Sequence, residues 1–196
     1  MSRDVFLSVC VATSVLVGCW AGCDGQSSSS SSGQGISSQR SNRVIIEYDA
    51  LPSILIEAES GTVTPPVAIF EDTDASEGKY VLAPEGPDHK EISIGGDVMF
   101  SLKAPEPGNY VLWVRVKWSG ACGNSLGVFL DGAELGAIGD PVYETWHWVR
   151  LARKTLRLDP AEHVLTLTNR EDGSSVDQVL LTTDADYRPT GVESPS

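Results

Sequence analysis

The sequence predicts an all-β fold, an antiparallel β-sandwich of the jelly-roll type. Between about residues 43 and 184, apolar and polar residues alternate with a period of two, as in strands that bury one face. Glycine, proline and aspartate interrupt this alternation at short intervals, which is typical of turns. No segment shows a sustained apolar stripe with helical spacing. Many short strands separated by turns favour a sandwich or jelly roll over a mixed fold.

The first residues have the pattern of an export signal. Arg3 precedes an apolar run over residues 5–18, which is shorter than the roughly 20 residues that span a bilayer. We therefore interpret it as the apolar region of a signal peptide. The Leu-Val-Gly-Cys sequence at residues 16–19 resembles the lipobox of bacterial lipoproteins, in which the cysteine is lipidated. The resemblance implies an exported protein that is anchored through Cys19 in the bacterial cell envelope, at the outer membrane or cell surface. An ordinary secretory signal, cleaved near residues 21–23, is the alternative.

Four segments follow from this pattern. Residues 1–19 form the signal peptide with its lipobox cysteine, and residues 20–43 form a flexible linker rich in serine and glycine, with six consecutive serines at 27–32. Such a linker has too little apolar surface to offset the entropy lost on ordering. Residues 44–186 form the β-sandwich, and residues 187–196 form a flexible tail.

Within the sandwich the clearest strand is residues 110–118. Its two faces are Tyr110, Leu112, Val114, Val116 and Trp118 on one side, and Val111, Trp113, Arg115 and Lys117 on the other. The other predicted strands are residues 54–59, 67–70, 79–83, 98–103, 126–130, 146–151, 164–168 and 176–182. Asp131-Gly132 and Asp172-Gly173 mark turns or hairpins between them.

The charge and cysteine content limit the partners. The net charge of −13 would repel a phosphate backbone, so we expect no nucleic acid partner. An acidic chain suits divalent cations, although solubility alone also explains the charge. Of the four cysteines, Cys23 and Cys122 lie outside the signal and lipobox, and either a disulfide between them or free thiols are compatible with the sequence.

Carboxylates lie in both the first and the last predicted strand. Glu57 and Glu59 are two residues apart and point to the same side of the first strand, and Asp177 lies in the last. An unpaired charge on such a segment is costly unless it is solvated or bound to a hard cation with oxygen ligands. A glycosidase pair must flank the scissile bond from two sides, whereas Glu57 and Glu59 project in parallel. The sequence has no nucleophile, nucleotide or zinc motif, so we predict a protein that is not an enzyme.

Residues 146–148, Trp-His-Trp, place two indoles on one face of a strand. Buried core rings are one interpretation. A ring at the start of a strand, beside a loop, is instead suited to stack on the apolar face of a sugar. Trp146 is nearer the preceding loop and is the better candidate for a sugar platform, whereas Trp148 is the better core residue.

The domain resembles carbohydrate-binding modules of families 6 and 35, which are galactose-binding-like jelly rolls. The matching residues run in order across nearly the whole domain: 56–59, 75–81, 107–116, 124–125, 128–132, 135–138, 146–148, 163–167 and 170–182. Each motif is short, and their order and spacing together are specific for the fold.

The resemblance implies a structural calcium ion held by Glu57, Glu59 and Asp177. It also implies a sugar site made by two aromatic rings and an amide. Trp146 matches one ring position and Tyr80 matches the other. Where family 6 modules have an asparagine before the last strand, this chain has Ser174 and Ser175, which offer no bidentate amide. Asn124 is the residue that could replace it.

These observations predict a non-catalytic, calcium-stabilised module that binds a polysaccharide or other glycan. It would touch the membrane only through its lipid anchor. The alternative is an adhesion or assembly module that uses the same fold to bind a protein partner, because jelly rolls host many binding functions.

Overall fold

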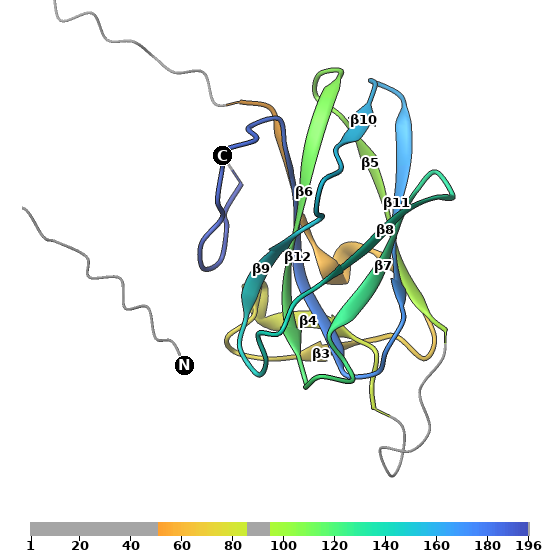
Figure 1. Ribbon diagram of the computed structural model, residues 1–196, viewed down its shortest axis with the longest axis vertical. Coiled ribbons are helices and arrows are strands. Elements are labelled where there is room, and N and C mark those ends of the chain that lie inside the picture. Colours follow the sequence, from red (N-terminus) through yellow and green to blue (C-terminus); the bar gives the residue numbers. More distant parts are fainter. Residues whose placement is uncertain (1–50, 86–94, 196) are drawn as a thin grey trace, which may run out of the picture. The chain divides into compact units, whose positions relative to one another are not determined.

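Two antiparallel sheets form the part of the chain that the computed structural model describes, residues 51–85 and 95–195 (Figure 1). The first sheet has the order β10-β6-β12-β4-β3, with β1 beside β12 and β9 beside β6. Its strands are β1 (Ser53–Glu57), β3 (Ala68–Glu71), β4 (Lys79–Leu82), β6 (Gly108–Trp118), β9 (His147–Arg150), β10 (Leu156–Leu158) and β12 (Ser174–Thr182). The second sheet has the order β2-β5-β11-β7-β8. Its strands are β2 (Thr62–Thr64), β5 (Asp97–Lys103), β7 (Ser125–Leu130), β8 (Ala133–Gly139) and β11 (Glu162–Asn169). The predicted all-β sandwich is confirmed.

The core lies between the two sheets. The predicted inner face of β6 is confirmed, since Tyr110, Leu112, Val114, Val116 and Trp118 are all 0% exposed. The second sheet supplies the opposite wall of the same apolar cluster through alternate residues of β5 and β11. Burying a large apolar side chain stabilises a fold by roughly 1.5–3 kcal/mol, so this alternation is the main reason that β6 lies at the centre.

Three strands were not predicted. β2 and β10 have only three residues each, which is too short for an alternating pattern to be recognised. β8 is an edge strand that is mostly exposed on both faces, so its sequence has no apolar alternation. Two predicted boundaries also shift: β1 ends at Glu57 and continues as a short 3-10 turn, η1 (Ala58–Ser60), and Trp146 precedes β9.

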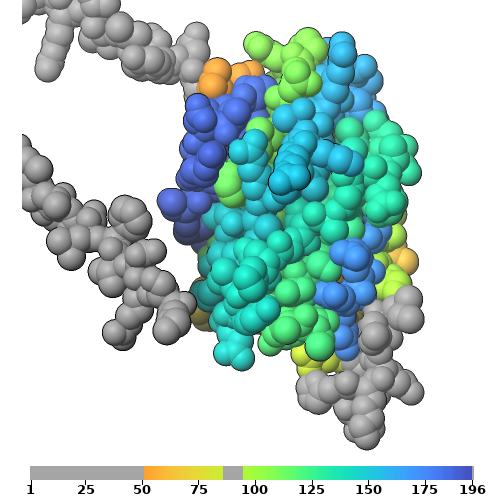
Figure 2. Space-filling view, in the orientation of Figure 1, coloured from red at the N-terminus to blue at the C-terminus, as the bar shows by residue number. Residues whose placement is uncertain are grey.

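The C-terminal segment covers the outer face of the first sheet, where the sequence suggested a flexible tail. The indole N–H of Trp148 donates to the carbonyl of Gly191 at 2.9 Å. The Gln178 side chain binds the backbone of Glu193 twice, accepting from its N–H and donating to its carbonyl, both at 3.0 Å. These contacts cover a second apolar cluster that includes Trp113. In the space-filling view the dark-blue C-terminal segment lies directly against the neighbouring surface (Figure 2).

The predicted signal peptide, Cys19 and the linker all lie outside the described residues. Within the described residues, no helix is long and apolar enough to cross a membrane. Cys122 is exposed and is not in a disulfide.

Candidate functional site

Two predicted aromatic residues meet on the outer face of the first sheet. Tyr80 lies on β4, and Trp146 lies in the loop that leads into β9. Their ring centroids are 5.5 Å apart and their planes are nearly perpendicular, at 77°. Phe70 pairs with Tyr80 across β3 and β4, extends this aromatic row at 6.0 Å, and is 38% exposed. Phe70 was not predicted as a site residue, and it lies on β3, an edge strand of the first sheet.

Polar contacts fix the position of the Trp146 indole. Its N–H donates to Asp72 Oδ2 at 3.3 Å, and the same carboxylate forms an ion pair with Lys117. The Lys117 ammonium lies 4.7 Å from the Trp146 ring centroid and 5.5 Å from that of Tyr80, within the range of cation–π attraction. The hydrogen bond from Lys117 is the main reason that the pKa of Asp72 lies below its ordinary value. Trp146 is therefore a half-buried, oriented ring rather than a freely exposed one.

Two hollows lie in this region, and Trp146 lines one of them. One has a volume of about 420 Å³, and its lining residues are Asp74, Arg115, Lys117, Glu144, Thr145 and Trp146. The other has a volume of about 570 Å³, and its lining residues are Leu82, Pro84, Glu85, Lys117, Trp118, Ser119, Glu144, Gly173 and Ser175. Lys117 and Glu144 belong to both. Glu144 has a φ of 58°, which is uncommon for a residue other than glycine and recurs at functional sites. The larger hollow lies at the ends of three strands, with Leu82 from β4, Lys117 from β6 and Ser175 from β12.

Asn124 does not join the ring pair. Its side-chain amide donates to the carbonyl of Asp140 at 3.3 Å, and its backbone N–H donates to Glu171 at 3.0 Å. It is absent from the described residues that line the two hollows. Its expected role as a sugar-binding amide is therefore not supported by its position. Ser175 does line the larger hollow, whereas the Ser174 hydroxyl donates to the carbonyl of Glu171 at 3.2 Å.

Asp140 holds the loop that carries Glu144 and Trp146. Its Oδ1 accepts hydrogen bonds from the Trp118 indole at 3.1 Å and from the backbone N–H of Val142 at 3.1 Å, and it lies 3.0 Å from His147 Nε2. These contacts tie the loop to the core strand β6. No sequence pattern indicates this role of Asp140, because its three partners converge only in the folded chain.

The acids predicted to bind calcium lie close together. One oxygen of Glu57 accepts from Gln178 at 2.7 Å and from the Ser76 hydroxyl at 3.1 Å. The other oxygen of Glu57, Oε2, and Oε2 of Glu59 are buried and have no hydrogen-bond partner. Burial is the main cause that raises the pKa of both side chains above the ordinary value of 4.5, and the neighbouring Asp177 and Glu77 carboxylates raise both further. Two buried, unpaired carboxylate oxygens suit a cation.

Asp177, the third predicted calcium ligand, contacts a cationic side chain of the chain itself. It is 0% exposed, its Oδ1 accepts from the backbone N–H of Ser76 at 2.8 Å, and its Oδ2 forms an ion pair with buried Arg115. Across residues 51–85 and 95–195, no group of three histidine, cysteine, aspartate or glutamate side chains is arranged to hold a metal ion. The three predicted ligands therefore share a region, but Asp177 is engaged by a guanidinium. This ion pair was not predicted, because the strand periodicity places Arg115 on the outer face of β6 without indicating its partner.

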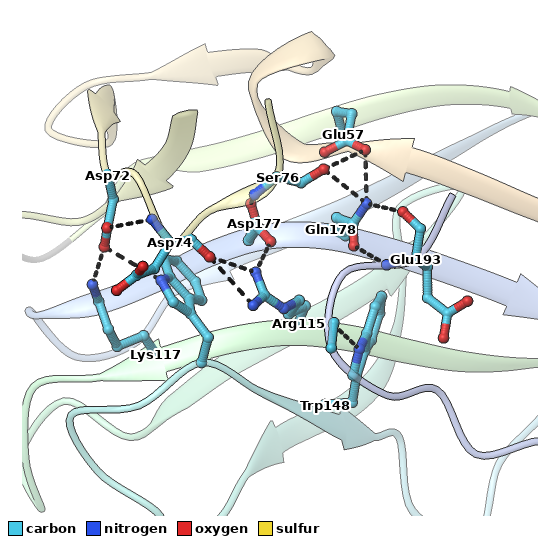
Figure 3. Close-up of polar contacts among 12 residues, drawn as sticks. Glu57, Asp72, Asp74, Ser76, Arg115, Lys117, Trp148, Asp177, Gln178 and Glu193 are labelled. Carbon is cyan, nitrogen blue, oxygen red and sulfur yellow. Dashed lines mark hydrogen bonds and ion pairs between the residues drawn. The ribbon is translucent and has the colours of Figure 1, made fainter. Parts of the chain in front are cut away.

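The segment from Asp72 to Gly78 links the rings to the acids (Figure 3). Asp72 binds Trp146 and Lys117, and the Asp74 carbonyl lies 3.4 Å from both terminal nitrogens of Arg115. Ser76 then contacts Asp177 through its backbone and Glu57 through its hydroxyl. Figure 3 shows these polar contacts as one row from Lys117 to Glu193.

No protein-family model matches the chain, and no curated protein matches it either. Solved structures do match it. The C-terminal CBM6 of LamC, a marine laminarinase from Zobellia galactanivorans, is 22% identical with a TM-score of 0.51, and the match covers 67% of this chain and 99% of that one. A family 35 carbohydrate-binding module from Clostridium thermocellum is 17% identical with a TM-score of 0.51, covering 66% and 96%. This chain has the fold of family 6 and family 35 carbohydrate-binding modules.

The same fold also occurs as one part of larger enzymes. A GH26-CBM35 β-(1,4)-mannanase from Podospora anserina is 18% identical with a TM-score of 0.54. The match covers 70% of this chain but only 29% of the mannanase. The carbohydrate-binding-module fold of this chain therefore corresponds to under a third of that enzyme.

Proposed function

We propose that this protein is a non-catalytic carbohydrate-binding module that holds a glycan at the Trp146 hollow. The observation that carries the proposal is the oriented Trp146 ring beside Tyr80, at the wall of a hollow of about 420 Å³. The apolar face of a sugar stacks on such a ring, and Lys117, Arg115 and Asp74 supply donors and acceptors for hydroxyl groups. The similarity to isolated carbohydrate-binding modules supports this function.

Trp146→Ala tests the glycan site. Loss of a central aromatic anchor removes at least about 2 kcal/mol of binding free energy, on the order of a 30-fold loss of affinity. We therefore expect that a polysaccharide that retards the unmodified domain in affinity electrophoresis no longer retards the variant. Laminarin and β-1,4-mannan, the polysaccharides implied by the names of the matched proteins, form the first panel, together with a glycan array.

Trp148→Ala is the matched control, because Trp148 is two residues away on β9 and contacts the C-terminal segment instead of the hollow. It should keep the affinity of the unmodified domain. If no glycan binds the unmodified domain, or if Trp146→Ala binds as well as Trp148→Ala, the proposal fails and the protein-binding alternative gains support.

The proposed module also holds a structural calcium ion at Glu57 and Glu59. The two buried, unpartnered oxygens fit a cation that prefers oxygen ligands. Calcium takes 6–8 such ligands, so a backbone carbonyl near Gly78 or Lys79 and water would complete the shell. Asp177, held by Arg115, would contribute its negative charge nearby. The ion would neutralise the acids and connect η1 with the segment before β4.

Calcium should raise the melting temperature, and a chelator should lower it, because a ligand that binds only the folded state stabilises that state. The effect should depend on pH. The pKa values of Glu57 and Glu59 are raised by folding, so without calcium the folded state loses stability as pH rises through them. Calcium should therefore stabilise most at neutral pH and lose its effect below about pH 4.5, where protons occupy both carboxylates. Scanning calorimetry over pH 4–8 measures this; a Glu57→Gln, Glu59→Gln variant that still responds to calcium would contradict the assignment.

We also propose that Cys19 carries a lipid that holds the exported protein at the cell envelope. Its position at the end of a lipobox-like sequence supports this. Cys19→Ala should move the protein from the membrane fraction to the soluble fraction of an expressing bacterium, whereas Cys122→Ala should not. Equal membrane retention of both variants would contradict the anchor.

A further inference from the structure

The hollow lined by Trp146 and the larger hollow share Lys117 and Glu144, so they meet at these side chains. We propose that they form one trough that binds an internal stretch of an uncharged glycan chain, with consecutive sugars in the two hollows. This inference rests on the proposed glycan-binding function and adds the larger hollow as a second binding region.

The lining of the larger hollow suits a sugar. Leu82 and Pro84 supply an apolar surface above the buried Trp118, and Ser119 and Ser175 supply hydroxyl groups that both donate and accept hydrogen bonds. Each hollow, at about 420 and 570 Å³, falls in the range of roughly 300–1,000 Å³ that is usual for small-ligand sites. A single sugar would leave one of them empty, whereas a chain that crosses the shared border would use both.

The charges of the trough favour an uncharged ligand. Both cations that line it are already paired, Lys117 with Asp72 and Arg115 with Asp177. The carboxylates of Asp74 and Glu144 also line it, and the whole chain carries a net charge of −13. An acidic sugar would be repelled, whereas carboxylates are good acceptors for sugar hydroxyl groups.

Lys117 and Glu144 thus become the polar groups at the middle of the bound chain. Lys117 has three donors and only one ion-pair partner among the described contacts, so it can also donate to a ligand. Glu144 is exposed and accepts from sugars on either side of the border. A chain that binds at these residues continues into a hollow on either side of them, so the trough takes an internal stretch of the chain and not its end.

The test is the dependence of affinity on chain length. Calorimetry measures the binding of disaccharide to hexasaccharide fragments of the panel polysaccharide that retards the domain most. We expect affinity to rise at least about tenfold along this series and then to level off. Leu82→Ser, which makes the apolar floor of the larger hollow polar, should reduce that rise. Val164→Ser, at an exposed apolar residue on β11 of the other sheet, should leave it unchanged.

The outcomes separate this inference from the proposed function. Binding of a disaccharide as tight as that of the hexasaccharide, or a rise that Leu82→Ser leaves intact, overturns the trough while the Trp146 site stands. The absence of any glycan binding overturns both. A carboxymethylated form of the same polysaccharide should bind more weakly at low salt, and equal or tighter binding of this form would overturn the preference for uncharged chains.

Discussion

Asp177→Ala should lower the free energy of unfolding by about 3–5 kcal/mol, because it leaves a buried guanidinium without its counter-charge. Arg115 is only 6% exposed, and Asp177 is its ion-pair partner across the β6–β12 pairing. The variant also removes the acceptor for the Ser76 backbone N–H at 2.8 Å. Urea denaturation in the presence of a chelator measures this loss separately from any contribution of calcium.

The double variant Arg115→Met, Asp177→Leu is the control. It replaces both charged side chains with apolar ones. Such a replacement of a buried ion pair often leaves the stability of the fold unchanged or raises it. We expect it to be more stable than Asp177→Ala. A loss below about 1 kcal/mol for Asp177→Ala would mean that Arg115 reaches solvent in solution, since exposed pairs contribute that little.

Alternation in the sequence was sufficient to predict the central strands. Both faces of β6 follow from the period of two, because Tyr110 to Trp118 alternate between the core and the outer cluster that contains Val111 and Trp113. Alternation could not reveal β8, an edge strand with little burial, or the role of residues 187–195, whose contacts to Gln178 and Trp148 use backbone groups. Backbone contacts of this kind leave no pattern in side-chain polarity.

The candidate site was predictable only in part, because its contacts join residues that are far apart in the sequence. Trp146 was identified as a ring near a loop and Tyr80 through the family resemblance, and the structure brings their ring centroids to 5.5 Å. Lys117 was placed correctly on the outer face of β6, but its contact with both rings depends on how β4 and the loop before β9 are placed. Asn124 was chosen by residue type alone, and its amide instead binds Asp140. The roles of Lys117 and Asn124 therefore depend on which residues the tertiary structure brings close to them.

The segment from Asp72 to Gly78 contacts both the aromatic rings and the acidic side chains. Asp72 orients Trp146 at one end of the segment, and Ser76 contacts Glu57 and Asp177 near the other. A cation that orders Glu57 would therefore restrain the backbone that presents Asp72 to the sugar platform. Under this arrangement the proposed calcium ion would also support the proposed glycan binding by pre-organising the site.

Trp118→Ala should lower the free energy of unfolding by about 3–5 kcal/mol, the usual range for deleting a fully buried aromatic side chain. Trp118 is 0% exposed at the end of β6, and its indole N–H donates to Asp140 at 3.1 Å. The variant should also weaken glycan binding, because Asp140 anchors the loop that carries Glu144 and Trp146. Urea denaturation and affinity electrophoresis on the same preparation measure the two effects.

Trp118→Phe separates the two roles of this indole. It keeps most of the apolar area but loses the N–H, so the remaining loss should be about 1.5–3 kcal/mol, the value of a hydrogen bond to a charged acceptor. If anchoring through Asp140 matters for binding, Trp118→Phe and Asp140→Ala should both weaken glycan binding. The combined variant should weaken it no further than Asp140→Ala alone, since the Trp118 hydrogen bond is one of the contacts that Asp140→Ala removes. Additive losses would mean that Trp118 and Asp140 support the loop independently.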